Sequence, residues 1–194
     1  MSDIEAKCVY FGSAGPQNTN RTLELARERA LDLGMRHVLV ASTSGKTGAR
    51  AAEVMKGLQV IVVSHSAGFA APNEQQLQPE YRQVIESNGA RVLTCQHALG
   101  GVGRAVRRKL GTYQLDEIIA FVLRNFCEGV KVACELTMMA TDAGLVPAGQ
   151  EIVAIAGTGS GADTAVVIRA ANAQDFFDLR VLEIICKPRL ASGR

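Results

Sequence analysis

One stretch of this sequence decides the predicted fold, His37-Val38-Leu39-Val40-Ala41-Ser42-Thr43-Ser44-Gly45-Lys46-Thr47-Gly48. It opens with an apolar, β-branched run that is typical of a buried strand. Residues 49–55 favour a helix, so the polar residues in between form a turn that leads from a strand into a helix. The N–H groups of such a turn point into one small volume, to which the helix dipole adds partial positive charge. We therefore expect an anion site over Ser42 to Gly48, with a tight turn that binds no ligand as the alternative.

The side chains of this turn suit a phosphate group. Three hydroxyl side chains precede Gly45 and can donate hydrogen bonds, and Lys46 supplies a positive charge. Gly45-Lys46-Thr47 also ends the Walker A motif, but that motif needs a glycine five positions before Gly45, where this chain has Val40. No magnesium-binding aspartate is evident after a second strand. We therefore expect neither an NTPase nor a metal site.

Length and charge narrow the classes of protein to consider. With 194 residues, the chain is expected to form a single domain over residues 1–194. Its net charge of +2 provides no dedicated surface for a polyanion, so nucleic acid is not an expected partner. No apolar run reaches the roughly 20 residues that span a bilayer, and residues 1–7 lack the pattern of a signal peptide. We expect no membrane partner.

The five cysteines are scattered, and most of them lie inside apolar runs. Their odd number and the absence of a Cys-x-x-Cys pair favour reduced thiols that pack in the core, as in cytoplasmic proteins. They are Cys8, Cys95, Cys127, Cys134 and Cys186. The sequence therefore predicts a cytoplasmic location.

Strand-like runs and amphipathic segments alternate through the first half of the chain. Gln59 to Ser64 is apolar without alternation, which is typical of a strand buried on both faces of a parallel sheet. Further strands are expected at residues 7–11, 91–94, 152–156, 164–169 and 181–186, and helices at residues 18–31, 49–55, 79–87, 104–110, 117–127 and 130–143. Asp116 is expected to cap the fifth of these helices, and Gly129 is expected to separate it from the sixth. No helix is expected between the two strands that flank residues 157–163, so at least one antiparallel strand is predicted there.

Four segments rich in Gly, Ser, Thr or His follow strand ends. They are Ser42 to Gly48, Ser64 to Phe69, Cys95 to Gly103 and Gly157 to Asp163. In open α/β sheets, ligands bind outside the carboxyl ends of the strands. Because the carboxyl ends of parallel strands lie at the same edge, we expect these segments to surround one ligand site.

Several residues in or near these segments have two interpretations. His65 and His97 are either catalytic imidazoles or hydrogen-bonded residues that line a pocket. Glu135 lies in an apolar helix and is either a buried carboxylate with a partner or a helix-edge residue in water. Gly157-x-Gly159-x-Gly161 resembles half of a dinucleotide fingerprint, but a strand follows where that motif needs a helix. Residues 157–161 form either a wide hairpin or a second loop whose backbone binds the same ligand. The basic segment Arg104 to Lys109 either attracts anions or is a solvated helix face.

The order of these motifs resembles the C-terminal domain of pyruvate kinase. The similarity rests on residues 37–47, on the helix after them and on the strand 59–64, and it is strongest between Thr22 and Leu99. In that family, a Thr/Ser-Gly-Arg/Lys-Ser/Thr loop binds the phosphate of a sugar bisphosphate effector, and Ser42 to Thr47 matches it. A later glycine loop folds over the same effector, and Gly157 to Asp163 looks like its counterpart. Since 194 residues leave no room for the catalytic barrel, we do not expect a pyruvate kinase.

The chain is similar in particular to the stand-alone proteins of this kind that are common in archaea. That resemblance implies a three-layer α/β/α sandwich with a mostly parallel mixed sheet and an antiparallel edge strand. It also implies flavin mononucleotide (FMN) as the bound cofactor of some members, with no settled reaction.

Motifs and resemblance together predict a phosphorylated small molecule, FMN by resemblance, at the C-terminal edge of the sheet. The expected binding residues are Ser42, Thr43, Ser44, Gly45, Lys46, Thr47, Ser64, His65, His97, Gly157, Thr158, Gly159, Ser160 and Gly161. Two alternatives stay open: an enzyme, as a flavin-dependent oxidoreductase or a sugar-phosphate hydrolase or isomerase, and a ligand-sensing regulatory module. No catalytic residue is assigned. The apolar helices from Asp116 to Ala143 suit a homo-oligomer face as well as a core.

Overall fold

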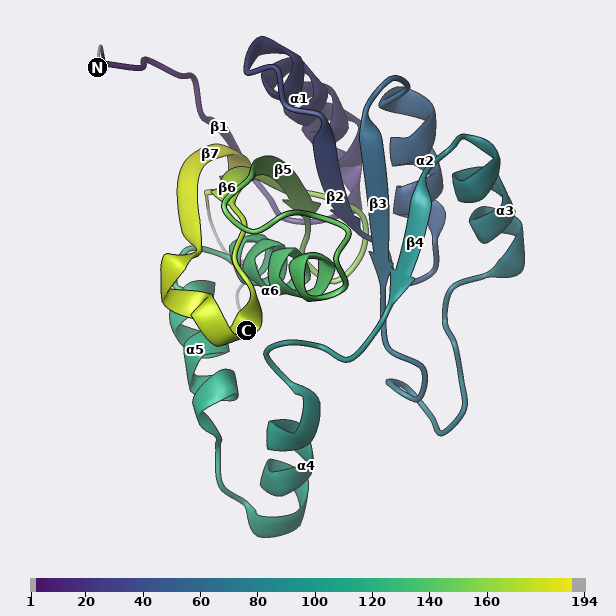
Figure 1. Cartoon of the computed structure of the whole chain (residues 1–194), viewed down its shortest axis with the longest axis vertical. Helices are drawn as coiled ribbons and strands as arrows, with labels where there is room; N and C mark the ends of the chain where they lie inside the picture. The colour runs from purple at the N-terminus through teal and green to yellow at the C-terminus, as the bar shows by residue number, and fades with distance from the viewer. Residues whose placement is uncertain (1–2, 190–194) are drawn as a thin grey trace.

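The computed structural model describes residues 3–189, so both ends of the domain expected over residues 1–194 lie outside the described residues. Seven strands form one sheet with helices on both faces (Figure 1). The strands are β1 (Val9–Phe11), β2 (His37–Ala41), β3 (Gln59–Ser64), β4 (Arg91–Thr94), β5 (Glu151–Ala156), β6 (Thr164–Arg169) and β7 (Arg180–Pro188). The helices are α1 (Thr19–Asp32), α2 (Lys46–Val54), α3 (Pro79–Ser87), α4 (Gly101–Leu110), α5 (Leu115–Arg124) and α6 (Glu128–Asp142), with the 3-10 turns η1 (Pro16–Asn18) and η2 (Ala173–Asp178). None of the helices between residues 3 and 189 is both long and apolar enough to cross a bilayer.

Alternate residues of the central strands face two separate apolar layers. Val38 and Val40 of β2 pack into the cluster with α1, α2 and α3, whereas Leu39 between them packs into the cluster with α6. Because both faces of these strands are covered, neither face carries the polar side chains that would produce alternation. The helix α5 packs on α6, and α4 contacts α5 and projects from the body of the molecule (Figure 1). The predicted three-layer α/β/α sandwich is confirmed.

The strand order in the sheet is β1-β7-β6-β5-β2-β3-β4. All neighbouring strands run parallel except β6, which is antiparallel to both β5 and β7. The mixed sheet is therefore confirmed, but its antiparallel strand lies inside the sheet and not at the predicted edge. The reason is that β7 returns beside β6 and then pairs with β1 on its other side.

The winding of the chain reverses between β2 and β5. From β2 the chain proceeds through β3 to β4 at one edge, and from β5 it proceeds through β6 to β7 toward the other edge. Nevertheless, β2 and β5 are direct neighbours, with Leu39 opposite Ala154. The loops that leave their carboxyl ends therefore diverge at a topological switch point, where open α/β sheets bind ligands.

Several helix boundaries differ from the prediction: α2 and α4 begin at Lys46 and Gly101, three residues before the expected starts, and α5 ends at Arg124, three residues before the expected end. The helix α5 begins at Leu115 without a side-chain cap, so Asp116 is a residue of its first turn and not the cap. The helix α6 begins at Glu128, so Gly129 lies inside its first turn and does not break the chain. A Cβ atom on Gly129 would collide with Thr164 of β6. This glycine is therefore explained by the close approach of α6 to the sheet.

All five cysteines are free thiols, and Cys127, Cys134 and Cys186 are buried. Burial raises the pKa of Cys134 and of Cys186 to about 12. These two side chains therefore remain protonated at neutral pH and act as small apolar groups of the core.

Candidate functional site

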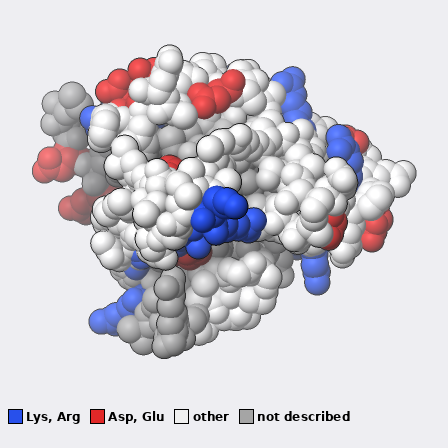
Figure 2. Space-filling model, turned by 90° about the horizontal axis from the view of Figure 1, so that it is seen from below, with Lys and Arg blue, Asp and Glu red and all other residues white. Residues whose placement is uncertain are grey.

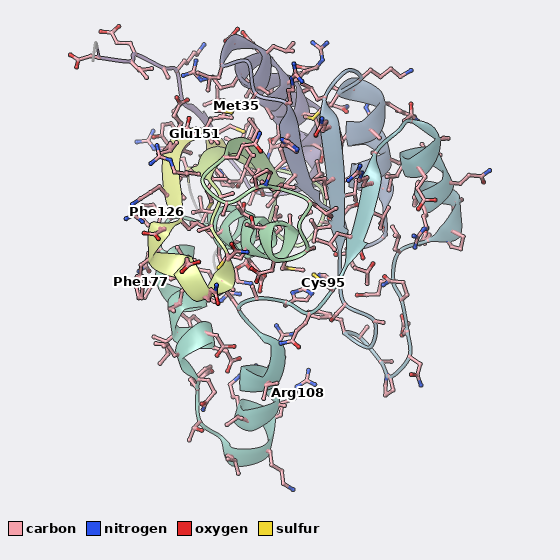
Figure 3. The ribbon with its side chains drawn as sticks, in the orientation of Figure 1. Met35, Cys95, Arg108, Phe126, Glu151 and Phe177 are labelled. Atoms are coloured by element: carbon pink, nitrogen blue, oxygen red, sulfur yellow. The ribbon has the colours of Figure 1, made fainter. Side chains whose placement is uncertain are left out.

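A cavity of about 620 Å³ opens at the carboxyl edge of the sheet. In Figure 3, Met35 and Glu151 mark the amino ends of β2 and β5 near the top, and Cys95 marks the carboxyl end of β4 below. The cavity is bordered by the loops after β2, β3, β4 and β5 and by one side of α6. The four segments that follow these strand ends in the sequence therefore contribute to one space.

The turn after β2 is held by a hydrogen bond of its own. The Gly48 N–H donates to Ser42 Oγ at 3.0 Å, so the hydroxyl takes the place of an absent intrahelical acceptor at the start of α2. In the same first turn, the N–H of Thr47 has no intrahelical acceptor, and Thr47 lines the cavity. This end of α2 can therefore accept an anion from the cavity.

Gly45 does not line the cavity, but it shapes the turn. Its φ is 97°, a left-handed conformation that favours glycine. A Cβ atom there would lie 2.6 Å from side-chain atoms of both Leu77 and Tyr81. The next residue, Lys46, is exposed and does not line the cavity. The glycine therefore allows close packing of the turn against the segment that leads into α3.

The glycine loop after β5 is organised by Asp163, whose side chain is fully buried. One carboxylate oxygen accepts hydrogen bonds from the N–H groups of Gly15 at 2.9 Å and Thr158 at 3.2 Å. A Cβ atom on Gly157 would lie 2.6 Å from the carbonyl oxygen of Gly161, so the loop folds back tightly on itself. The loop residues that line the cavity are Gly157, Gly159, Ser160 and Gly161. Here a buried carboxylate positions backbone that faces the cavity.

His65 follows β3 directly and links two polar side chains. Its Nδ1 lies 2.8 Å from Gln76 Oε1, and its Nε2 lies 3.2 Å from Thr43 Oγ1. Burial lowers the pKa of His65 below its ordinary value, and the hydrogen bond to Gln76 only partly opposes this effect. The ring is therefore neutral at neutral pH, and Gln76 sets which of its nitrogens carries the proton.

Phe69 and His97 lie beside His65 and form one wall of the cavity with it. The ring centroids of Phe69 and His97 are 4.9 Å apart, and those of Phe69 and His65 are 4.1 Å apart. The guanidinium of Arg104 lies 4.8 Å from the centroid of the Phe69 ring. Within residues 3–189, the buried Nε2 of His97 has no hydrogen-bond partner. This wall combines planar groups suited to stacking with one cation.

Lys131 and Glu135 form a buried ion pair on the side of α6 that faces the cavity. Lys131 Nζ lies 2.6 Å from Glu135 Oε2, and the two residues are only 6% and 4% exposed. Glu135 also accepts the N–H of Leu99 at 3.0 Å. Burial alone would raise the pKa of Glu135, but His97 and Lys131 outweigh it and bring the pKa to about 2. His97 Nδ1 is 3.8 Å from the carboxylate, beyond hydrogen-bond distance, so we assign most of the lowering to Lys131.

The charges around the cavity favour an anion. Arg104, Arg124 and Lys131 line it, together with the carboxylates of Glu128 and Glu135. Arg124 pairs with Glu128 at 2.6 Å and Lys131 pairs with Glu135, so in the described part of the chain Arg104 has no carboxylate partner. On the face seen from below, one patch of Lys and Arg side chains lies near the centre, and the other charged side chains of both signs lie further out (Figure 2).

The structure brings together eleven of the residues expected to bind the ligand. Those that line the cavity are Ser42, Thr43, Ser44, Thr47, Ser64, His65, His97, Gly157, Gly159, Ser160 and Gly161. Gly45, Lys46 and Thr158 were also expected in the site, but they do not line the cavity.

Of the charged residues that α6 contributes, Glu135 was considered as a buried carboxylate with a partner, but Glu128 and Lys131 were missed, although the sequence carries a signal. Glu128, Lys131 and Glu135 recur at the spacing of one helix face in a helix that is otherwise mostly apolar. Charges on one face of a buried helix indicate a polar cavity beside that face. Phe69 and Gln76 were missed for another reason, because they lie in the loop between β3 and α3, where no periodicity reports the direction of a side chain.

One family model and several solved structures match this chain. The family model described as pyruvate kinase, alpha/beta domain matches residues 20–168 of this chain. Similar solved structures include a pyruvate kinase from Cryptosporidium parvum, with 12% identity, coverage of 79% of this chain and 23% of that chain, and a TM-score of 0.43. The Cryptosporidium parvum pyruvate kinase in complex with ADP has 13% identity, coverage of 79% and 24%, and a TM-score of 0.43.

A further crystal structure of the Cryptosporidium parvum pyruvate kinase has 12% identity, coverage of 79% of this chain and 22% of that chain, and a TM-score of 0.40. This chain thus spans less than a quarter of the length of each of these enzymes. The family match itself extends over most of this chain, from Asn20 to Ile168. The chain therefore belongs to the pyruvate kinase alpha/beta domain family.

Proposed function

We propose that this domain binds a phosphorylated small molecule in the cavity at the carboxyl edge of the sheet, with FMN as the first candidate. One observation carries the proposal: the hydroxyl-rich turn at the start of α2 opens into a cavity of about 620 Å³ that three cationic side chains also line. That volume lies within the range of about 300–1,000 Å³ that small-molecule sites occupy. FMN is named because the resemblance to stand-alone relatives implies it.

The phosphate has a natural place at the start of α2. There, the N–H of Thr47 and the hydroxyls of Ser42, Thr43 and Ser44 lie at the positive end of the helix dipole. Arg104 supplies a positive charge that no carboxylate of the described residues neutralises. The phosphate would therefore interact with the turn and with a cation brought in by α4.

The remainder of the ligand has both planar and apolar neighbours. Phe69 and the two imidazoles form a wall suited to a flat ring system. Val132, Leu136 and Met139 of α6 add apolar surface to the same cavity. This combination of an anion site with a stacking wall suits a nucleotide-like molecule better than a bare sugar phosphate.

The experiment compares FMN with riboflavin, which lacks the phosphate, by titration of flavin fluorescence. We expect FMN to bind at least about tenfold more tightly, as one charge-assisted contact provides. Arg104→Gln should remove most of this preference. Arg108→Gln is the matched control, because Arg108 lies one turn further along α4 and does not line the cavity (Figure 3). Equal affinity for the two flavins would contradict the phosphate site.

The position of Lys46 alters one expectation drawn from the sequence. Its side chain is exposed and outside the cavity lining, so Lys46→Ala should weaken FMN binding less than Arg104→Gln does. If Lys46→Ala has the larger effect, then the phosphate lies outside the turn and not within the cavity.

If flavin binds, its absorbance can also distinguish the hypothesis of an enzyme from that of a binding module. A flavin-dependent oxidoreductase would lose its flavin absorbance when a nicotinamide donor is added, whereas a binding or sensing module would not. Ligand-dependent retention of a protein partner would favour the regulatory module.

A further inference from the structure

Three side chains beside the anion-binding turn form a continuous hydrogen-bonded chain. Gln76 Oε1 lies 2.8 Å from Nδ1 of His65, and Nε2 of the same ring lies 3.2 Å from Thr43 Oγ1. All three residues line the cavity, and Thr43 belongs to the turn at the start of α2. We propose that Thr43, His65 and Gln76 form a proton-coupled anion receptor, in which the binding of a phosphate dianion is accompanied by uptake of one proton at His65. This inference rests on the proposed function of the cavity.

The direction of the hydrogen bonds carries the first step. With the carbonyl oxygen of Gln76 facing it, Nδ1 of His65 carries the ring proton and donates it. In the neutral ring, Nε2 then carries no hydrogen, so it accepts a hydrogen bond from the hydroxyl group of Thr43. A hydroxyl has one hydrogen, so Thr43 offers only lone pairs to the cavity in this state. A phosphate oxygen would meet an acceptor there, which is unfavourable.

Protonation of His65 reverses one of these bonds. Nε2–H then donates to Thr43 Oγ1, and the hydroxyl hydrogen of Thr43 becomes free to donate to a phosphate oxygen. The contact with Gln76 is unchanged, because Nδ1 donates in both states. A single proton therefore converts Thr43 from an acceptor into a donor for the ligand and also places a positive charge behind it.

The charge of the cavity carries the second step. Its lining contains three cationic side chains and two carboxylates, so with neutral imidazoles it carries one net positive charge. A phosphate dianion carries a second negative charge that this lining does not balance. One additional proton on the protein brings the charges into balance, and the chain Thr43–His65–Gln76 is the group placed to hold it.

The groups around His65 set the pH range of the effect. Burial lowers the pKa of His65, Gln76 raises it, His97 and Arg104 lower it, and Glu135 raises it. The ring of Phe69 covers one side of the imidazole. A bound dianion adds negative charge beside the ring and raises its pKa in the complex.

The sign of the pH dependence follows from these two pKa values. Above the pKa of the complex, the ring is neutral in both states and the affinity does not depend on this proton. Between the two values, binding takes up a proton, and the affinity increases as the pH falls, by at most about tenfold per pH unit. Below the pKa of the free protein, the ring is charged in both states and the dependence ends.

Isothermal titration calorimetry with phenyl phosphate tests the proposal. Titrations in buffers of different ionisation enthalpy measure the number of protons taken up per ligand. At pH about 7.5, phenyl phosphate is mostly a dianion, because the second pKa of phosphate esters is about 6. We expect an uptake that rises toward one proton as the pH is lowered from about 7.5 toward about 7, where the ligand is still mostly a dianion, and we expect His65→Gln to abolish it. His37→Gln is the matched control, since His37 lies at the opposite end of β2, beside Gln150.

Two further arms assign the proton to the ring. Phenyl sulfate is a monoanion whose single charge the lining already balances, so we expect little or no proton uptake when it binds, and an uptake as large as that with phenyl phosphate would overturn the charge argument. Nitrogen NMR chemical shifts of the wild-type His65 ring should change from the neutral to the doubly protonated form when phenyl phosphate binds. This second measurement needs no variant, so it remains decisive if His65→Gln fails to fold.

The outcomes separate the inference from the function on which it rests. Binding with proton uptake that is lost in His65→Gln supports both. Binding without proton uptake overturns the receptor alone. Proton uptake that persists in His65→Gln, or that is lost in His97→Gln but not in His65→Gln, overturns it as well. No binding of phenyl phosphate at all contradicts the proposed phosphate site and the receptor together.

Discussion

Replacing Lys131 by methionine is expected to destabilise the protein by about 3 kcal/mol at neutral pH, because it leaves the buried carboxylate of Glu135 without its cation. Nζ of Lys131 lies 2.6 Å from Glu135 Oε2, and both side chains are less than a tenth exposed. Methionine keeps the length and most of the volume of the lysine stem. The effect of the substitution is therefore attributed to the charge and not to a cavity.

The magnitude follows from the pKa of Glu135. Burial would raise that pKa, yet His97 and above all Lys131 bring it from the ordinary 4.5 to about 2. This lowering of the pKa, at about 1.4 kcal/mol per pKa unit, corresponds to roughly 3–4 kcal/mol that the ionised carboxylate contributes to stability. Breaking a buried ion pair by removing one partner costs about 3–5 kcal/mol in other proteins, and the expected loss lies at the lower end of that range.

The assay is urea unfolding of the wild type and of Lys131→Met over a series of pH values. In the wild type, the depressed pKa means that the contribution of Glu135 is complete above about pH 4.5 and is lost as the pH falls through about 2. In Lys131→Met, burial becomes the main influence and raises the pKa of Glu135. Protonation of this carboxylate then removes the buried charge that lacks a partner, which stabilises the folded variant. The stability difference between the two proteins should therefore shrink as the pH falls.

Two controls make the measurement specific. Arg82→Met breaks the exposed pair between Arg82 and Glu86, which has the same spacing along a helix and a distance of 2.8 Å, and it should cost less than about 1 kcal/mol. The double variant Lys131→Met/Glu135→Gln keeps an acceptor for the N–H of Leu99 and should recover most of the lost stability. A loss below about 1 kcal/mol for Lys131→Met, or a difference that does not change with pH, would refute this reasoning.

Two further predictions concern the turn and the core. Gly45→Ala should destabilise the fold by about 2–4 kcal/mol in urea unfolding, since it combines a left-handed φ with a collision; Gly34→Ala, with a left-handed φ and nothing within 4 Å of the added Cβ, should cost only about 1 kcal/mol. Equal losses for the two variants would contradict the packing explanation. The thiols of Cys134 and Cys186, with pKa values of about 12, should resist iodoacetamide in the folded protein and react only after denaturation, as peptide mass spectrometry can measure. Labelling of either cysteine at the rate of an exposed thiol under native conditions would contradict their burial.

The elements of the fold were predictable where a local pattern is strong. The strands β2 and β3 each contain a run of apolar residues, most of them β-branched, without alternation, and in the structure both are covered on both faces. The strand boundaries at Gln59–Ser64 and Arg91–Thr94 match the expected ones residue for residue. These segments are predictable because the order of apolar and polar residues in a strand indicates which of its faces are buried.

The predictions that failed depend on contacts between distant segments. Gly129 has the local signature of a break, but it lies inside α6 because only a glycine lets this helix approach Thr164. The antiparallel strand β6 was expected at an edge, yet β7 and β1 extend the sheet beyond it. Strand order is decided by pairing across the sheet, and the residues of a single strand do not identify the strands that pair with it.

The candidate site divides in the same way. The turn from Ser42 to Thr47 was recognisable because its hydroxyls and glycine stand between a strand and a helix, and parallel strands bring such turns to one edge. The direction of each side chain was not recognisable. Lys46 is exposed and does not line the cavity, whereas Lys131 and Arg104 reach it from helices that are far away in the sequence.

By itself, the sequence determined the strand–turn–helix unit, the α/β class and the choice of the sheet edge that carries the cavity, since each follows from the residues of one segment and the rule for parallel strands. Only the tertiary structure decided which cations face the cavity. It also decided that Glu135 is a partnered carboxylate and that Gln76, His65 and Thr43 form one hydrogen-bonded chain. The physical reason is distance dependence: hydrogen bonds and ion pairs act over a few ångströms in space, and residues that are remote along the chain come that close only after the layers have packed.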